Sequence, residues 1–164
     1  RSQLVELTRS ANSHVVFEEA KAGFVSLTLL KSRILDMIEN QKPDTVLLII
    51  DSFNSWIDTA VNHSGRPKDE IVAETLTNLL DFTQEVGLTV LVSAQNTNQS
   101  VHKTVNEALE AAADTYITLS WEKGGRANSE GLMETRAFFR KNRNGEANKN
   151  TFGKFNGKLQ KFSD

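Results

Sequence analysis

The stretch TVLLIID, from Thr45 to Asp51, decides how the rest of the chain is interpreted. Five consecutive apolar residues, Val46 to Ile50, end directly in a carboxylate. A short continuous apolar run predicts a strand buried on both faces, as in the centre of a parallel sheet. Asp51 then lies at the carboxyl end of that strand, where open α/β sheets bind ligands. Because Asp-Ser is also ordinary capping chemistry, a helix N-cap at Asp51 and Ser52 is the alternative interpretation.

Length and composition predict one ordered domain. The chain has 164 residues, of which 38% are hydrophobic and 24% charged, so it is long enough to bury a core. No run approaches the roughly 18 apolar residues of a membrane helix, and no signal peptide is present, so we expect a soluble, intracellular protein without a membrane partner. The absence of Cys excludes disulfides and thiolate metal sites, and the three His lack metal-ligand spacing.

The charge is unevenly distributed. From Trp121 to the end, ten Lys or Arg stand against five acidic residues, whereas residues 1–120 carry nine against sixteen. A basic tail on an acidic body favours contact with phosphate or with an acidic neighbour. A solvated basic face is the alternative.

Hydrophobic periodicity predicts strands and helices in alternation. The expected strands are His14–Phe17, Thr45–Asp51, Leu88–Val92 and Thr115–Leu119, and the expected helices are Ser2–Ser10, Ser26–Gln41, Pro67–Val86 and Val101–Ala113. Between Asp51 and Pro67 we expect a polar stretch with a turn at Ser64-Gly65. Repeated alternation of strand and helix is typical of parallel βαβ units.

The last third of the chain has a different pattern. Leu132–Arg140 and Thr151–Phe162 alternate as strands, and the polar loop between them contains Asn144-Gly145. This pattern predicts an antiparallel hairpin appended to the parallel sheet. With no internal repeat or linker, residues 1–164 are expected to form a single domain.

Polar residues follow three of the predicted strands: Glu18-Glu19, Asp51-Ser52 and Gln95-Asn96. In a parallel sheet these strand ends share one edge, so their side chains are expected to converge on one ligand. Two carboxylates suit phosphoryl chemistry, one beside Mg²⁺ and one polarising the attacking water, while an amide senses the terminal phosphate. The alternatives are a solvated turn for the Glu pair and ordinary loop residues for the amides.

Several motifs together resemble a known family. VLLIIDS resembles the Walker B strand of RecA-like ATPases, LTVLVSAQN resembles the next strand with its sensor amide, and AADTYITL with RAFFRKNRNG resembles the closing part of DnaB-type helicases. The layout is also similar to the packaging motors of double-stranded-RNA bacteriophages. The resemblance implies an α/β fold with a RecA-like, mostly parallel twisted sheet, flanked by helices and followed by the antiparallel hairpin.

The resemblance also implies roles for individual residues. It makes Glu19 or Glu18 the catalytic base, Asp51 with Ser52 a Mg²⁺-ATP site, and Gln95 with Asn96 the sensor. Lys141 and Arg143 would reach the nucleotide of a neighbouring subunit, which requires a homo-oligomer such as a hexameric ring. For these two cations, a basic hairpin tip is the alternative.

The complete phosphate-binding loop of that family, G-x-x-x-x-G-K-[ST], is absent. Arg1-Ser2 stands where its final Lys-[ST] is expected, so these residues are assigned to nucleotide binding, with Ser2 as a second Mg²⁺ ligand. Either the sequence starts just past the loop or it belongs to a degenerate relative. Without the amides and Lys of the loop, we expect the chain as given to bind ATP poorly.

The resemblance also implies that the loops Asn54–Lys68 and Thr97–Lys103 meet single-stranded nucleic acid, with Arg66, Lys68, His102 and Lys103 as the candidate contacts. The leading hypothesis is an ATP-hydrolysing motor on nucleic acid, located in the cytoplasm or in a viral particle. One alternative is a nucleotide-free RecA-like module that acts through protein interactions. Another is a KaiC-like regulatory ATPase.

Overall fold

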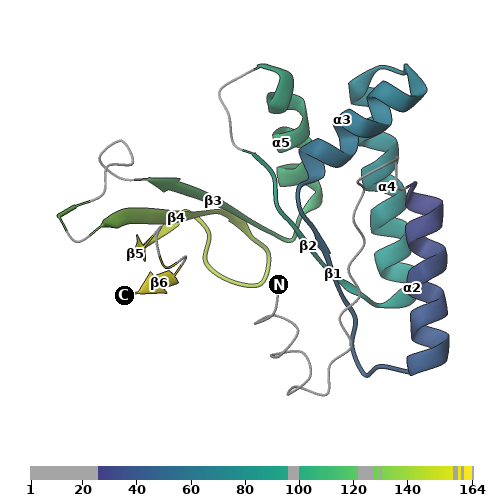
Figure 1. Ribbon diagram of the computed structural model, residues 1–164, viewed down its shortest axis with the longest axis horizontal. Coiled ribbons are helices and arrows are strands. Elements are labelled where there is room, and N and C mark those ends of the chain that lie inside the picture. The colour runs from purple at the N-terminus through teal and green to yellow at the C-terminus, as the bar shows by residue number, and fades with distance from the viewer. Residues whose placement is uncertain are drawn as a thin grey trace.

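The computed structural model describes residues 26–95, 100–121, 128–129, 131–156, 159 and 161–163 (Figure 1). Its helices are α2 (Leu27–Gln41), α3 (Phe53–Ser64), α4 (Lys68–Val86) and α5 (Ser100–Ala112). Its strands are β1 (Leu47–Ile50), β2 (Thr89–Val92), β3 (Thr115–Trp121), β4 (Leu132–Asn142), β5 (Lys149–Asn156) and β6 (Lys161–Ser163). The predicted helix Ser2–Ser10 and strand His14–Phe17 lie outside the described residues.

Local capping signals set the ends of the helices. The Ser26 hydroxyl accepts a hydrogen bond from the Leu29 amide at 3.2 Å at the start of α2. Gly87 closes α4 with a φ of 71° and donates its amide to the Thr83 carbonyl at 2.9 Å. The helices predicted over 26–41, 67–86 and 101–113 are confirmed to within one residue at each end.

The segment after Asp51 is helical, so the prediction of a polar stretch there is wrong. Helix α3 begins after Ser52 and ends at Gly65, which has a φ of 67°. Phe53, Ile57 and Ala60 repeat at helical spacing and are all buried. That spacing is visible in the sequence, but the polar residues between these anchors obscure it.

The predicted single RecA-like, mostly parallel sheet is also wrong. Strands β1 and β2 form a two-stranded parallel sheet, and a separate antiparallel sheet has the order β3-β4-β5-β6 (Figure 1). The strand at Thr115 exists, but it pairs antiparallel with β4, from Thr115 opposite Asn142 to Trp121 opposite Thr135. Its residues alternate between exposed and half-buried, which is typical of an antiparallel strand with one open face.

The predicted antiparallel hairpin exists, but the prediction that it is appended to the parallel sheet is wrong, because it belongs to the separate sheet β3-β4-β5-β6. Strands β4 and β5 pair from Leu132 opposite Asn156 to Phe139 opposite Lys149. The second predicted strand, Thr151–Phe162, is divided into β5 and β6, which pair with each other. The antiparallel part of the fold is therefore larger than expected, and the parallel part is smaller.

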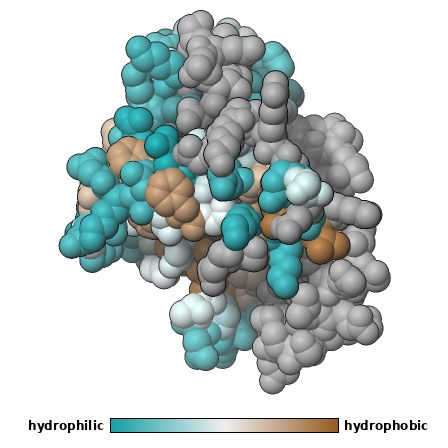
Figure 2. Space-filling view, turned by 90° about the vertical axis from the view of Figure 1, so that its left-hand side faces the viewer, coloured by the Kyte–Doolittle hydropathy of each residue, from teal (hydrophilic) through white to brown (hydrophobic). Residues whose placement is uncertain are grey.

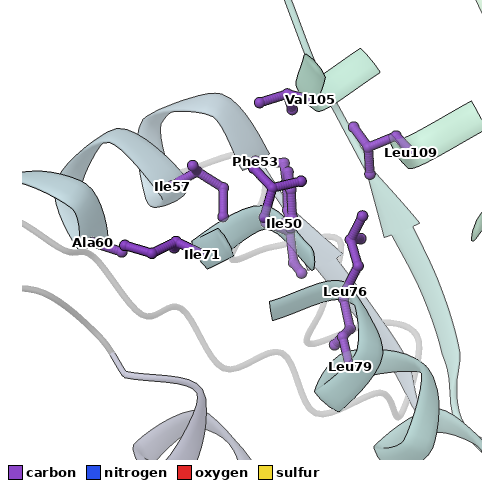
Figure 3. Close-up of a cluster of buried hydrophobic side chains, with 10 residues drawn as sticks. Ile50, Phe53, Ile57, Ala60, Ile71, Leu76, Leu79, Val105 and Leu109 are labelled. Atoms are coloured by element: carbon purple, nitrogen blue, oxygen red, sulfur yellow. The ribbon is translucent and has the colours of Figure 1, made fainter. Parts of the chain in front are cut away.

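The main core lies where the helices cover one face of β1 and β2. Figure 3 shows Ile50 and Phe53 side by side, with Ile57 farther along α3. Side chains of α4 and α5 complete this cluster, which consists of Ile50, Phe53, Ile57, Ala60, Ile71, Val72, Leu76, Leu79, Val105 and Leu109. A second, smaller cluster joins α2 to α4 through Ile34, Phe82 and Leu88. This packing fixes the chain on both sides of Asp51.

In the part of the chain that the structure describes, the opposite face of the parallel sheet is exposed, so the prediction that the central strand is buried on both faces is wrong. Leu47 is 57% exposed, Ile49 60% and Leu91 57%. Figure 2 looks onto the end of the molecule that carries β3 to β6, where apolar side chains also reach the surface. Exposed apolar residues of β3 to β6 include Leu119, Trp121, Phe152 and Phe162. Within the described residues, no helix combines the length and the apolar character required to cross a membrane.

Candidate functional site at the ends of β1 and β2

Asp51 is exposed directly beyond the carboxyl end of β1, beside the corresponding end of β2. Its carboxylate accepts a hydrogen bond from the Ser93 hydroxyl. The Ser93 backbone is held as well, because its amide donates to the Ile50 carbonyl at 2.9 Å and its carbonyl accepts from the Phe53 amide at 2.9 Å. Parallel pairing of the two strands therefore fixes the Asp51 carboxylate against Ser93. The sequence prediction missed Ser93, although its position directly after the LTVLV strand was a usable signal.

Ser52, not Asp51, is the N-cap of α3. The Ser52 hydroxyl accepts from the Ser55 amide at 3.5 Å and lies 3.0 Å from the Ser55 hydroxyl. The peptide bond between Asp51 and Ser52 is cis. Capping by Ser52 leaves the Asp51 carboxylate outside the helix terminus. The capping alternative for this dipeptide therefore applies to Ser52 alone.

Gln95 lies at the same edge, just beyond β2, and its side chain is exposed. Its backbone amide donates to the Asn54 side-chain oxygen at 2.8 Å, and its carbonyl accepts from the Asn106 side-chain amide at 3.2 Å. Asn54 is only 2% exposed. The structure thus brings Asp51 and the backbone of Gln95 to one edge through α3 and α5.

The remaining predicted nucleotide-site residues lie outside the described residues. They are Arg1, Ser2, Glu18, Glu19 and Asn96. The predicted convergence of the Glu pair with Asp51 stays a prediction for this reason.

The surroundings of Asp51 suit a metal ion that is bound partly by a nucleotide better than a metal ion that is bound by protein side chains alone. Among the described residues, no group of three or more His, Asp or Glu side chains could hold a metal ion. Mg²⁺ in nucleotide sites, however, commonly binds one or two carboxylates together with substrate phosphates and water. One exposed carboxylate meets that requirement. Asp51 is the described carboxylate at this strand-end edge that could serve as such a ligand.

Lys141 and Arg143 contact the carboxyl end of α5 within the same chain. The Lys141 ammonium donates to the Glu110 carbonyl at 3.0 Å and to the Ala111 carbonyl at 2.7 Å. The Arg143 guanidinium forms an ion pair with Asp114 at 2.7 Å, and its backbone amide donates to the Asp114 carbonyl at 2.9 Å. Cations at this position satisfy the last carbonyls of a helix and its dipole. We name this arrangement, made by Lys141 and Arg143, the α5 clasp.

Tyr116 and Arg140 lie next to the α5 clasp. The Arg140 guanidinium contacts the Glu110 carboxylate at 3.0 Å. Burial raises the pKa of the Tyr116 hydroxyl, the charge of Glu110 raises it further, and Arg140 partly opposes this effect. The sheet β3–β6 is thus attached to α5 through polar contacts as well as through the half-buried Tyr116 ring.

Replacing Lys141 by Ala is expected to lower the free energy of unfolding by about 1 to 2 kcal/mol, because two helix carbonyls lose a charged donor. Lys103→Ala is the matched control on α5, since Lys103 is 73% exposed and forms only a 3.7 Å pair with Glu107. It should change the unfolding free energy by less than about 0.5 kcal/mol. Urea denaturation of both variants measures the difference. Equal stability of the two variants would show that Lys141 does not hold α5.

The candidate nucleic-acid contacts have acidic neighbours. Arg66 pairs with Glu74 at 2.7 Å, and its pKa is raised, first by the hydrogen bond and charge of Glu74 and then by Glu70. The Lys68 ammonium lies 2.6 Å from the Asp58 carboxylate. Lys103 pairs with Glu107 as described above, and the side chain of His102 lies outside the described part. Positive charge at the described contacts is therefore locally compensated.

A separate hollow of about 310 Å³ lies between α2, α3 and α4. Its lining includes Ser26, Lys31, Ser64, Arg66, Glu74 and Asn78. Ser64 is the last residue of α3, whereas Asp51 precedes the first, and a helix of this length spans roughly 18 Å. The hollow is therefore not part of the strand-end site.

In comparisons with known proteins, no family model matches the chain, and the search of curated proteins finds no match.

Proposed function

We propose that the edge formed by Asp51, Ser93 and Gln95 takes part in Mg²⁺-dependent ATP hydrolysis, in a motor that acts on single-stranded nucleic acid. The observation that carries this proposal is the exposed Asp51 carboxylate at the end of a parallel strand, oriented by the hydroxyl of the neighbouring strand. Ligands of open α/β sheets bind at such strand ends. The order of VLLIIDS and LTVLVSAQN, which resembles the RecA-like ATPases, gives further support.

Each residue at this edge has a separate task in the proposal. Mg²⁺, when bound with ATP, neutralises charge that develops on the phosphates. Asp51 supplies the carboxylate that holds it, and the Ser93 hydroxyl keeps that carboxylate in one orientation. Gln95 is exposed at the same edge, and its side-chain amide would contact the terminal phosphate or the attacking water. The proposal requires the parallel pair β1–β2 and does not depend on a larger parallel sheet.

The test is ATP turnover by the full natural protein that contains this sequence, measured with and without Mg²⁺ and with and without single-stranded nucleic acid. Turnover that requires Mg²⁺ and increases with nucleic acid is the expected result. Mg²⁺-dependent turnover that nucleic acid leaves unchanged would replace the motor by a regulatory ATPase. Absence of both turnover and ATP binding would overturn the proposal.

A second candidate function is a nucleotide-free module that acts through protein interactions. The open face of the parallel sheet favours it, because Leu47, Ile49 and Leu91 expose apolar surface next to one another. Replacing Ile49 by Lys distinguishes the two functions. If the chain is a protein-interaction module, Ile49→Lys should abolish partner binding. If it is an ATPase, Ile49→Lys should leave Mg²⁺-dependent turnover unchanged, because the replaced side chain lies on the sheet face and not at the strand end.

A further inference from the structure

Gln95 is held by its backbone and not by its side chain. The two contacts come from different helices, since Asn54 belongs to the first turn of α3 and Asn106 to the middle of α5. Asn54 lies close behind Asp51 in the chain, so the same helix start connects Asp51 to Gln95. The side chain of Gln95, which is an exposed residue, makes neither of these two hydrogen bonds.

The orientation of the Asn106 amide follows from its partner. Its nitrogen donates to the Gln95 carbonyl at 3.2 Å, and exchanging nitrogen for oxygen would place two acceptors together. The Asn106 side-chain oxygen is buried and has no hydrogen-bond partner in the described part of the structure. Within the described residues, this oxygen is an unused acceptor on the side chain that holds the Gln95 carbonyl.

We propose that Asn54 and Asn106 are positioning residues that clamp the Gln95 backbone and thereby aim the Gln95 side chain at the ligand of Asp51. This inference rests on the proposed function for its chemical consequence, but the clamp itself is a property of the folded chain. Misplacing a group that acts on the reacting phosphate lowers the rate of the chemical step more than it weakens substrate binding. Loss of the clamp is therefore expected to lower kcat and to leave KM nearly unchanged.

The first arm of the test measures hydrogen exchange of the Gln95 backbone amide by NMR in the folded chain. Asn54→Ala removes the acceptor and should accelerate exchange on the order of tenfold or more. Asn54→Asp keeps an acceptor oxygen at the same place and should restore slow exchange. Asn62→Ala, on the exposed side of the same helix, is the control and should leave exchange unchanged.

The second arm measures ATP turnover by the full natural protein carrying Asn106→Asp. This replacement keeps the shape of the side chain but replaces its donor by an acceptor. We expect kcat to fall about tenfold or more at nearly constant KM. Asn78→Asp, an exposed amide on α4, is the control for an added charge and should keep both constants.

The two arms separate the failure of the clamp from the failure of the proposed function. Unchanged Gln95 exchange in Asn54→Ala would overturn the clamp, whatever the turnover. Faster Gln95 exchange in Asn54→Ala, together with no ATP binding or hydrolysis by the wild-type protein, would overturn the proposed function and leave the clamp intact. Faster exchange together with unchanged kcat in Asn106→Asp would overturn the role of the clamp in aiming Gln95.

Discussion

Asp51→Asn is expected to reduce Mg²⁺-dependent ATP turnover by about 10²-fold or more, because the site loses the charge that would hold the metal. The shape of the side chain is retained, and the amide oxygen still accepts from the Ser93 hydroxyl. Asp51 is exposed, so the free energy of unfolding should change by less than about 0.5 kcal/mol. Steady-state turnover and urea denaturation of the same preparation measure the two effects.

Asp44→Asn is the matched control for the loss of one negative charge. Asp44 is exposed and lies before β1, at the opposite end of the same strand. Turnover in this variant should remain within about twofold of the wild type, since surface charges farther away than a Debye length are largely screened. If both variants had the same turnover, Asp51 would have no special place in the reaction and the proposed site would fail.

Phe53→Ala is expected to cost about 3 to 5 kcal/mol of unfolding free energy, the usual loss for removing a fully buried aromatic ring. Phe53 is 0% exposed and lies in the main core beside Ile50. Its ring also meets Trp56 edge to face, with the centroids 5.9 Å apart. A loss of this size is a large part of the stability of an ordinary domain. Urea denaturation followed by circular dichroism measures it.

Phe152→Ala removes the same ring from the surface of β5 and is the control. Phe152 is 67% exposed, so the expected change is less than about 0.5 kcal/mol. Similar losses for the two variants would contradict the packing of α3 against the parallel sheet. Because Phe53 follows Asp51 so closely, that outcome would also remove the structural basis for the position of Asp51.

Local signals were sufficient for most elements of the fold. Ser26 and Gly87 mark helix ends by capping chemistry that depends only on neighbouring residues. Helix α3 was missed although Phe53, Ile57 and Ala60 have helical spacing, because short polar residues separate them. The signal for α3 is therefore local, because the helical spacing of its three apolar residues can be found within the segment itself.

The prediction of which strands pair with one another fails for a different reason. The sequence pattern correctly predicts a strand at Thr115, but its prediction that this strand joins the parallel sheet is wrong. Its alternating exposure and its pairing with β4 place it in the antiparallel sheet. Local sequence predicts that a segment is extended, whereas the neighbouring strand depends on contacts between distant residues.

For the candidate site, the sequence by itself determined the strand that ends in Asp51 and the position of Gln95 after the next strand. Only the tertiary structure placed Ser93 against Asp51, 42 positions away, and Lys141 on the carbonyl of Ala111, 30 positions away. It also decided that Leu47 and Ile49, on one face of TVLLIID, are exposed in the described part of the structure. The physical reason is that capping and periodicity act within a few residues, whereas register, burial and side-chain partners arise only when separate elements pack together.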